Sequence, residues 1–318
     1  MGRRFDVFNG DADGLCAVVQ WRLHAPGPAE AVTGLKRDIA LLHRVAAMAG
    51  DEVDVFDISM QRNRRDLMCL LDHGVRVRYF DHHAAGDMPA HPGLDAHIDE
   101  SSDVCTSLLV DRYLDGAHRA WALVGIYGDN LAAVADRLAC DAGFEPGDCA
   151  KLRRLGELVN YNAYGEEERD LCIAPRSLLA LMTRHADPRD MLAHEPVVAR
   201  IDAMRRSDLR QAMGEPAYWR GPQGSVHVLR DAPWSRRVIG CLANVLANRE
   251  PDLAHAVLKE RGDGYVVSVR APLTRPFGAH TLCSGFGGAG RSRAAGIDRL
   301  PRGELPRFVE AFANASWA

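Results

Sequence analysis

Acidic side chains and histidines follow three short apolar runs near the start of the sequence. The runs and the polar residues after them are Phe5 to Phe8 with Asp11 and Asp13, Val53 to Phe56 with Asp57, and Val75 to Phe80 with Asp81, His82 and His83. Carboxylates and imidazoles without a thiolate suit a pair of divalent ions, most naturally Mn2+ or Mg2+. Two ions about 3.5 to 4 Å apart can share a water, lower its pKa and clamp a phosphoryl group. We therefore expect a metal site built from these residues.

The first motif, Asn9-Gly-Asp-Ala-Asp-Gly14, follows an expected strand and opens an expected helix. Its glycine would permit unusual backbone dihedral angles in a tight turn. The spacing also fits the start of a calcium-binding loop, but the twelfth position is Gln20 and not a bidentate Glu. A solvated acidic turn is the alternative for this motif taken alone. Asp129, which closes the apolar stretch 121–127, is a further candidate ligand.

The elements that would position these residues follow a β-α-β-α-β order. Amphipathic stretches at 15–23 and 62–71 separate the three apolar runs, which indicates a parallel sheet covered by helices. The carboxyl ends of parallel strands meet at one edge, where α/β proteins bind ligands. Helical periodicity follows from about 101 to 210, and strand-like and helical segments return after a Gly- and Pro-rich stretch. We expect an α/β fold with a catalytic domain at 1–213, a linker at 214–224 and a smaller α/β substrate-binding domain at 225–318.

Charge is distributed unevenly along the chain. Residues 1 to 219 hold 25 Lys and Arg against 35 Asp and Glu, a balance of −10, whereas residues 220 to 318 hold 14 against 8, a balance of +6. An acidic part can gather carboxylates on metal ions, and a basic part can attract phosphates. The asymmetry therefore favours an anionic substrate, although acidic surfaces also serve solubility alone.

Composition excludes several other classes of protein. The 318 residues contain no apolar run long enough for a membrane helix, and no apolar segment near the start resembles a signal peptide. The eight cysteines include no Cys-x-x-Cys pair, so neither a disulfide framework nor a zinc site is expected. We expect a globular protein of the cytoplasm that does not act at a membrane.

A glycine-rich segment near the end could bind an anion. It matches a dinucleotide-binding fingerprint by its letters at 285–290, but too few residues follow for a β-α-β unit, and the Lys of a P-loop is absent. A plain glycine-rich turn is the alternative. Exposed backbone amides between arginines would make a cradle for phosphate. The residues expected to form it are Arg270, Gly287, Gly288, Gly290, Arg291 and Arg293.

Together these motifs resemble the DHH phosphoesterase superfamily, in its subfamily with a DHH-associated C-terminal domain, of the oligoribonuclease and pAp-phosphatase type. The matching segments are GDADG (10–14), VFDIS (55–59), DHH (81–83), GIYGDN (125–130) and GGAGRSRAAG (287–296). The resemblance implies that Asp57 bridges two Mn2+ ions, with Mg2+ as a possible substitute. It places Asp11 on one ion, and Asp13, His82 and Asp129 on the other. It also implies that His83 faces the substrate phosphate and that Asp81 orients the neighbouring histidine.

Two positions depart from the family pattern. Val7 stands where many members have a histidine ligand of the first metal, and Asn9 is the nearest replacement, so we expect a weaker or more hydrated first site. Arg291 stands where the C-terminal signature usually has a histidine. An arginine can still stack on a base and bind a phosphate with two hydrogen bonds, which would alter selectivity.

We expect a hydrolase in which hydroxide, activated by two metal ions, attacks short single-stranded oligonucleotides or linear dinucleotides such as pApA and releases mononucleotides. A small cleft between domains would favour short strands over duplexes, whose recognition needs a longer basic surface. The alternatives are a pAp phosphatase, a cyclic-dinucleotide phosphodiesterase, a longer-strand exonuclease, a polyphosphatase, and a nucleotide sensor without turnover. The expected partner is this nucleotide or another phosphoester, and the sequence does not indicate an oligomeric state.

Overall fold

The computed structural model describes residues 2–317 and divides into two compact units, residues 1–202 and 203–318. The division falls inside the helix α9 (Pro196–Gly214), earlier than residue 213, where we expected the first domain to end. Because one continuous helix joins the two units, the composition of the sequence does not change there. The boundary therefore cannot be located from the sequence pattern.

The first unit is built on a five-stranded sheet whose neighbouring strands are all parallel. Its order is β2-β1-β3-β4-β5. The strands are β1 (Arg4–Phe8), β2 (Glu30–Thr33), β3 (Glu52–Phe56), β4 (Arg76–Asp81) and β5 (Leu94–Ile98). The three expected strands are confirmed as the adjacent strands β1, β3 and β4, whereas the edge strands β2 and β5 were not predicted. Edge strands are shorter or less completely buried, so their apolar pattern is weak.

The strand order reverses direction between β1 and β3. The chain passes from β1 to β2 on one side and then crosses back to β3 on the other side of β1. Such a reversal opens a crevice at the carboxyl ends of the two strands, which is where doubly wound α/β proteins bind ligands.

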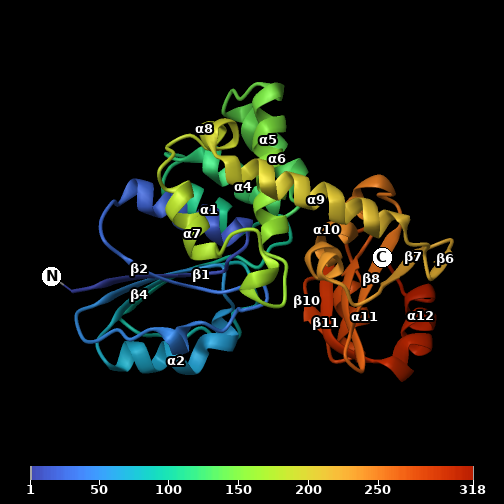
Figure 1. The fold of residues 1–318 in the computed structure, drawn as a ribbon. Coiled ribbons are helices and arrows are strands. Elements are labelled where there is room, and N and C mark those ends of the chain that lie inside the picture. Colours follow the sequence, from blue (N-terminus) through green and yellow to red (C-terminus); the bar gives the residue numbers. More distant parts are fainter. Residues whose placement is uncertain (1, 318) are drawn as a thin grey trace. The chain divides into compact units, whose positions relative to one another are not determined.

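Helices cover both faces of this sheet (Figure 1). The helix α2 (Met60–Asp72) lies on one face, over a cluster that includes Val53, Val55 and Val77. The helix α1 (Ala12–His24) lies on the other face, where its Trp21 ring packs against the stacked rings of Phe56 and Phe80. Both helices were expected, and both lead from the carboxyl edge of the sheet back toward its opposite edge.

The helical region expected from residue 101 onward is confirmed. It comprises α3 (Thr106–Tyr113), α4 (Arg119–Gly128), α5 (Ala132–Asp141), α6 (Pro146–Asn162), α7 (Pro175–Met182), α8 (Pro188–His194) and α9. Proline opens four of these helices, at positions where its missing N–H costs no helical hydrogen bond. Short 3-10 helices lie at Leu42–Arg44, Glu168–Asp170 and Arg302–Glu304. Within residues 2–317, no helix is long and apolar enough to cross a membrane.

The second unit contains a mixed six-stranded sheet of order β10-β11-β9-β8-β7-β6. Its strands are β6 (Trp219–Gly221), β7 (Gly224–Leu229), β8 (Ala254–Arg261), β9 (Gly264–Arg270), β10 (Ala289–Gly290) and β11 (Ala294–Pro301). Its helices are α10 (Pro233–Arg249), α11 (Ala279–Ser284) and α12 (Leu305–Ala313). A core that includes Val267, Phe308 and Phe312 holds the unit together. The smaller α/β unit expected from the sequence is therefore confirmed.

The expected linker at 214–224 was wrong in one respect. It includes β6, which pairs antiparallel with β7 through Gly221 and Gly224, so the stretch belongs to the second sheet. The Gly and Pro residues that suggested a linker form a tight hairpin turn, because both uses favour the same residue types. All eight cysteines are free.

Candidate metal centre

The expected ligands of the first unit gather at the carboxyl ends of β1, β3 and β4. Asp11 and Asp13 follow β1, Asp57 follows β3, and His82 follows β4, so they lie at the reversal of the strand order. Asp57 adopts a left-handed backbone with φ of 59°, which is uncommon outside glycine. Such strained positions persist where the surrounding structure fixes them and often mark functional sites.

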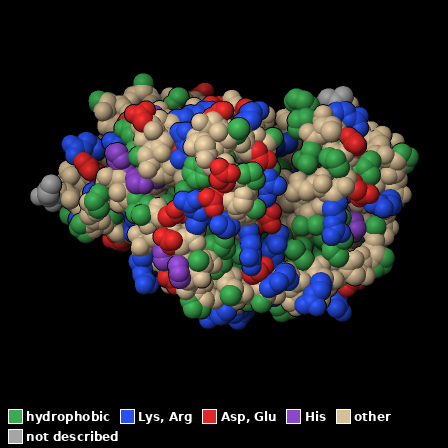
Figure 2. Space-filling view, turned by 90° about the horizontal axis from the view of Figure 1, so that it is seen from above, with side chains coloured by type: hydrophobic (Ala, Val, Ile, Leu, Met, Phe, Trp, Pro, Cys, Tyr) green, Lys and Arg blue, Asp and Glu red, His purple; other side chains and the backbone are tan. Residues whose placement is uncertain are grey.

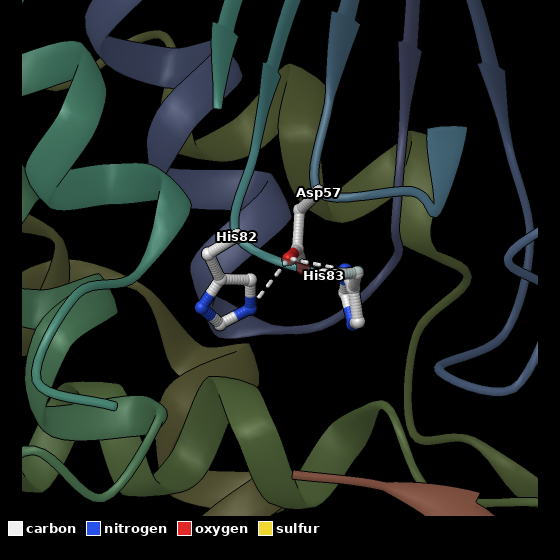
Figure 3. A group of neighbouring side chains, drawn as sticks. All are labelled: Asp57, His82 and His83. Atoms are coloured by element: carbon white, nitrogen blue, oxygen red, sulfur yellow. Dashed lines mark ion pairs between the residues drawn. The ribbon is translucent and has the colours of Figure 1, made fainter. Parts of the chain in front are cut away.

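Asp57, His82 and His83 form a group whose ligand atoms all lie within 4.8 Å of one another (Figure 3). The Oδ1 atom of Asp57 lies 3.2 Å from Nε2 of His82 and 3.9 Å from Nδ1 of His83. The side chains of Asp57 and His82 are almost fully buried, whereas that of His83 is 32% exposed. His83 is therefore the member of this group that reaches solvent.

The ring of His82 is held in one tautomer. Its Nδ1 lies 2.8 Å from the carbonyl oxygen of Val104, which can only accept a hydrogen bond, so Nδ1 carries a proton. In the neutral ring Nε2 is then an acceptor, and it faces oxygens of Asp57 and, at 3.8 Å, of Asp13. Acceptors that face one another need a proton or a cation between them. The donor set therefore fits a divalent ion held by Asp13, Asp57 and His82, a set that suits Mn2+ or Mg2+.

The start of α3 orients two of these carboxylates. The backbone amides of Thr106 and Ser107 each donate to Asp13 at 2.7 Å, and the Thr106 hydroxyl donates to Asp57 at 3.2 Å. The sequence predicts a helix start near the site in the run 103–107, but it indicates no contact for these two residues. Their signal was weak, because a Thr-Ser pair at a helix start has many uses, and only tertiary packing brings it to Asp13.

Buried like charges raise the affinity of these carboxylates for protons. Burial, together with the negative charge of Asp57, raises the pKa of Asp13 to about 7. Burial and the charge of Asp11 raise the pKa of Asp57 well above its ordinary value. A bound cation would relieve the same repulsion, so the electrostatics of the group favour cation binding.

Asp11 has a different environment, because a lysine neutralises it. Its Oδ1 caps α1 by accepting from the amides of Asp13 and Gly14, at 3.0 and 3.1 Å, and its Oδ2 forms an ion pair with Nζ of Lys36. Burial would raise the pKa of Asp11, but the Lys36 ammonium outweighs it and holds that pKa below its usual value. Conversely, Asp11 outweighs burial at Lys36 and raises the pKa of the ammonium, so Lys36 is charged. Sequence analysis did not single out Lys36.

Asn9 uses its side chain within the loop. Its amide nitrogen donates to the carbonyl oxygen of Lys36 at 2.9 Å, and its Oδ1 accepts from the amide of Asp11 at 3.1 Å. The expectation that Asn9 replaces a missing metal ligand therefore stays a prediction, and the structure gives this side chain a part in positioning Lys36.

The remaining expected residues of the first unit lie as follows. Asp81 is fully buried and its Oδ1 accepts a hydrogen bond from Nδ1 of His83 at 2.7 Å, so the histidine that it orients is His83. Asp129 caps the end of α4, close enough for its charge to raise the pKa values of Asp11 and Asp13. Both residues thus border the centre formed by the three strand ends.

The glycines of the first motif serve close packing and not unusual backbone angles, which corrects our expectation. Neither Gly10 nor Gly14 has a positive φ. A Cβ atom at Gly14 would lie 2.3 Å from the carbonyl oxygen of Asn9, and one at Gly10 would lie 2.1 Å from that of Gly34. Gly10 is needed because the loop after β2 packs directly against it, and Gly14 because the backbone of Asn9 lies against it.

The expected anion cradle in the second unit is only partly realised. The amides of Gly287 and Gly288 donate to carbonyl oxygens at the end of α11, at 3.1 and 2.8 Å, so they are not free to bind a phosphate. Gly290 has a φ of 143° and ends β10, and Arg291 and Arg293 lie in the turn between β10 and β11. Because the amides complete the helix end, the arginine side chains are the better candidates for anion contacts.

Much of the positive charge in this unit has structural partners. Arginines that form ion pairs with carboxylates include Arg220, Arg230, Arg236, Arg237, Arg299, Arg302 and Arg307. Arg270 donates through Nε to Asn244 at 2.7 Å and through Nη1 to Ser268 at 3.0 Å. On the face in Figure 2, Lys and Arg side chains are interspersed with Asp and Glu. The net balance of +6 therefore does not by itself identify a substrate surface.

Comparison with solved structures confirms the expected fold. The chain resembles a structure of exonuclease RecJ bound to manganese, with a TM-score of 0.57, 19% identity, and coverage of 98% of this chain and 89% of RecJ. It also resembles PggH, a pGpG-specific phosphodiesterase from Vibrio cholerae, with a TM-score of 0.57, 13% identity and coverage of 98% and 97%. An exopolyphosphatase-related protein from Bacteroides fragilis gives a TM-score of 0.53, 12% identity and coverage of 98% and 91%.

No family profile and no curated protein sequence matches the chain. The structural likeness is therefore one of fold, the two-unit α/β fold that the DHH-type motifs led us to expect. At these identities it defines the architecture, and the chemistry has to be argued from the residues at the strand ends.

Proposed function

We propose that this protein is a divalent-metal-dependent phosphoester hydrolase that acts on short single-stranded oligonucleotides or linear dinucleotides. The observation that carries the proposal is the group Asp57, His82 and His83 with Asp13 beside it, at the carboxyl edge of a parallel sheet, in which all members but His83 are buried. Mn2+ is the expected ion and Mg2+ the alternative, because all donors are carboxylates and imidazoles.

Each residue has a distinct task in this hypothesis. Asp13, Asp57 and His82 would hold the ion, and their hydrogen bonds to the start of α3 and to Val104 keep the ligand atoms in place before it binds. A bound divalent ion would polarise a phosphoryl oxygen and lower the pKa of a water.

His83 would contact the substrate phosphate. The hydrogen bond between its Nδ1 and Asp81 fixes the orientation of the ring, so a contact with the phosphate would be made through Nε2. The buried carboxylate of Asp81 stabilises the protonated ring, which can donate a hydrogen bond to a phosphoryl oxygen or to the leaving group.

The comparisons support the choice of substrate. PggH acts on pGpG, and its chain is covered to 97% by this one, so the two chains have nearly the same extent. RecJ, an exonuclease bound to manganese, supports the wider class of metal-dependent hydrolysis of nucleic-acid phosphodiesters. We therefore favour a linear dinucleotide as the first substrate to test.

A substrate panel with Mn2+ tests the proposal. The purified chain is incubated with pApA, pGpG, pAp, cyclic dinucleotides, a longer single strand and polyphosphate, and products are separated by anion-exchange chromatography. We expect mononucleotides from the linear dinucleotides, and none from the variant Asp57→Asn. Fastest turnover of pAp, of the longer strand or of polyphosphate would reassign the substrate. If wild type and variant are equally inert throughout while nucleotide binding persists, the protein is a sensor.

A further inference from the structure

The carboxylate of Asp11 has partners within the protein on both of its oxygens. Its Oδ1 accepts two backbone hydrogen bonds at the start of α1, and its Oδ2 contacts the Lys36 ammonium. The resemblance drawn from the sequence places a metal ion beside this carboxylate. In the structure a protein cation lies there.

Lys36 is fixed in this position at both its backbone and its side chain. Its carbonyl oxygen accepts from Asn9 at 2.9 Å, and its amide donates to the carbonyl oxygen of Ala163 at 3.4 Å. Its Nζ donates to Oδ1 of Asn160 at 3.2 Å and lies 5.6 Å from the centre of the Tyr164 ring. A carboxylate, an amide oxygen and an aromatic face together form a site for an ammonium ion.

Packing around the loop keeps the lysine there. The loop after β2 lies so close to the first motif that a Cβ atom at Gly10 would lie 2.1 Å from the carbonyl oxygen of Gly34. The side chain of Asn160 is buried near the end of α6, which also presents Ala163. Elsewhere the chain uses arginine for nearly all of its positive charge, with lysine only at 36, 151 and 259. A compact ammonium fits here, whereas a planar guanidinium would need more room.

We propose that the Lys36 ammonium is a built-in cation that takes the place of one divalent ion, so that the centre binds a single exchangeable metal through Asp13, Asp57 and His82. This inference rests on the proposed metal-dependent function. Lys36 would neutralise Asp11 and reduce the negative charge that an anionic phosphate meets on approach. It is a positioning residue, because it acts through Asp11 and makes no contact with the metal.

Metal stoichiometry tests this inference without reference to turnover. Mn2+ binding to the full chain is measured by equilibrium dialysis, and the bound ions are examined by electron paramagnetic resonance. We expect one Mn2+ per chain in the wild type, with the spectrum of an isolated ion. We expect two in Lys36→Met, with spin coupling because ions about 4 Å apart interact. Lys36→Arg tests whether any positive charge suffices, and Lys151→Met removes an exposed lysine as the control.

Two results would overturn the inference. The first is a spin-coupled pair of Mn2+ ions in the wild type, which would mean that Lys36 yields its position to a metal. The second is loss of the single Mn2+ in the double variant Asp11→Asn/Lys36→Met, which avoids leaving Asp11 unpaired and should otherwise keep wild-type binding. If the wild type binds two ions and hydrolyses dinucleotides, this inference is refuted and the proposed function stands. If the wild type binds a single ion and hydrolyses no substrate, the proposed function is refuted and this inference stands.

Discussion

The buried carboxylates at the carboxyl edge of the first sheet have different partners on its two sides. On the β1 side, Asp11 accepts hydrogen bonds from two backbone amides and forms an ion pair with the Lys36 ammonium. On the β3 and β4 side, Asp57 faces the imidazoles of His82 and His83 and accepts one hydroxyl hydrogen bond. The first arrangement pairs its carboxylate with a protein cation, whereas the second brings acceptor atoms together and favours a bound cation. Neighbouring carboxylates on one sheet edge therefore need not have the same role.

The largest expected effect comes from removing the charge of Asp57. Asn in this position should abolish Mn2+ binding and lower turnover of a linear dinucleotide by about 1,000-fold, because several kcal/mol of transition-state stabilisation depend on the ion. The fold should persist, since Asn also tolerates the left-handed backbone and one buried charge is removed. Calorimetry for Mn2+, steady-state kinetics and thermal melting measure these effects.

The control for Asp57→Asn is Asp72→Asn, an exposed carboxylate at the end of α2, far along the helix from the strand ends. It should change neither binding nor rate. If Asp57→Asn binds Mn2+ as tightly as the wild type, the carboxyl ends of β3 and β4 do not form the metal site.

The next largest effect distinguishes His83 from the proposed metal ligands. His83→Gln should lower kcat by about 100-fold, as expected for loss of a positioned proton donor. Its Mn2+ affinity should stay near that of the wild type, because Nδ1 of His83 is committed to Asp81. His82→Gln, by contrast, should weaken Mn2+ binding. Equal losses of Mn2+ affinity in both variants would make His83 a metal ligand and contradict the assignment.

A smaller effect is expected from the hydroxyl of Thr106. Thr106→Val removes its hydrogen bond to Asp57, worth about 1 kcal/mol, and should weaken Mn2+ binding by about fivefold. Thr106→Ser keeps the hydroxyl and should restore the wild-type affinity. Titration of Mn2+ followed by calorimetry gives both values. If Ser and Val variants behave alike, the hydroxyl does not orient the carboxylate.

An effect of similar size, but on substrate binding, is expected in the second unit. Arg291→Ala should raise KM for a linear dinucleotide by about fivefold, with kcat unchanged, because one charge-assisted contact contributes about 1 kcal/mol. Arg299→Ala, which removes an exposed arginine paired with Asp263, is the matched control. A fall in kcat with KM unchanged would show that Arg291 acts on the reacting phosphate and not on binding.

Sequence analysis located the strand ends well because their signal is local. A short apolar run followed by Asp or His marks the end of a buried strand wherever it lies, as it does at Asp57 and His82. It did not find β2, so the reversal of strand order between β1 and β3 could not be seen. It also assigned free amides to Gly287 and Gly288, because the letters of a glycine-rich turn do not say which carbonyl groups lie nearby.

From the sequence alone came the α/β order, the three central strands and the carboxylate and imidazole chemistry of the residues after them. These follow from apolar periodicity and side-chain chemistry, which are properties of neighbouring residues. Only the tertiary structure decided which carboxylates remain available to a metal. Lys36 lies 25 residues from Asp11 along the chain, and Asn160 lies 124 from Lys36. No local pattern links them, because their contact arises only when the loop after β2 and the end of α6 pack against the first motif.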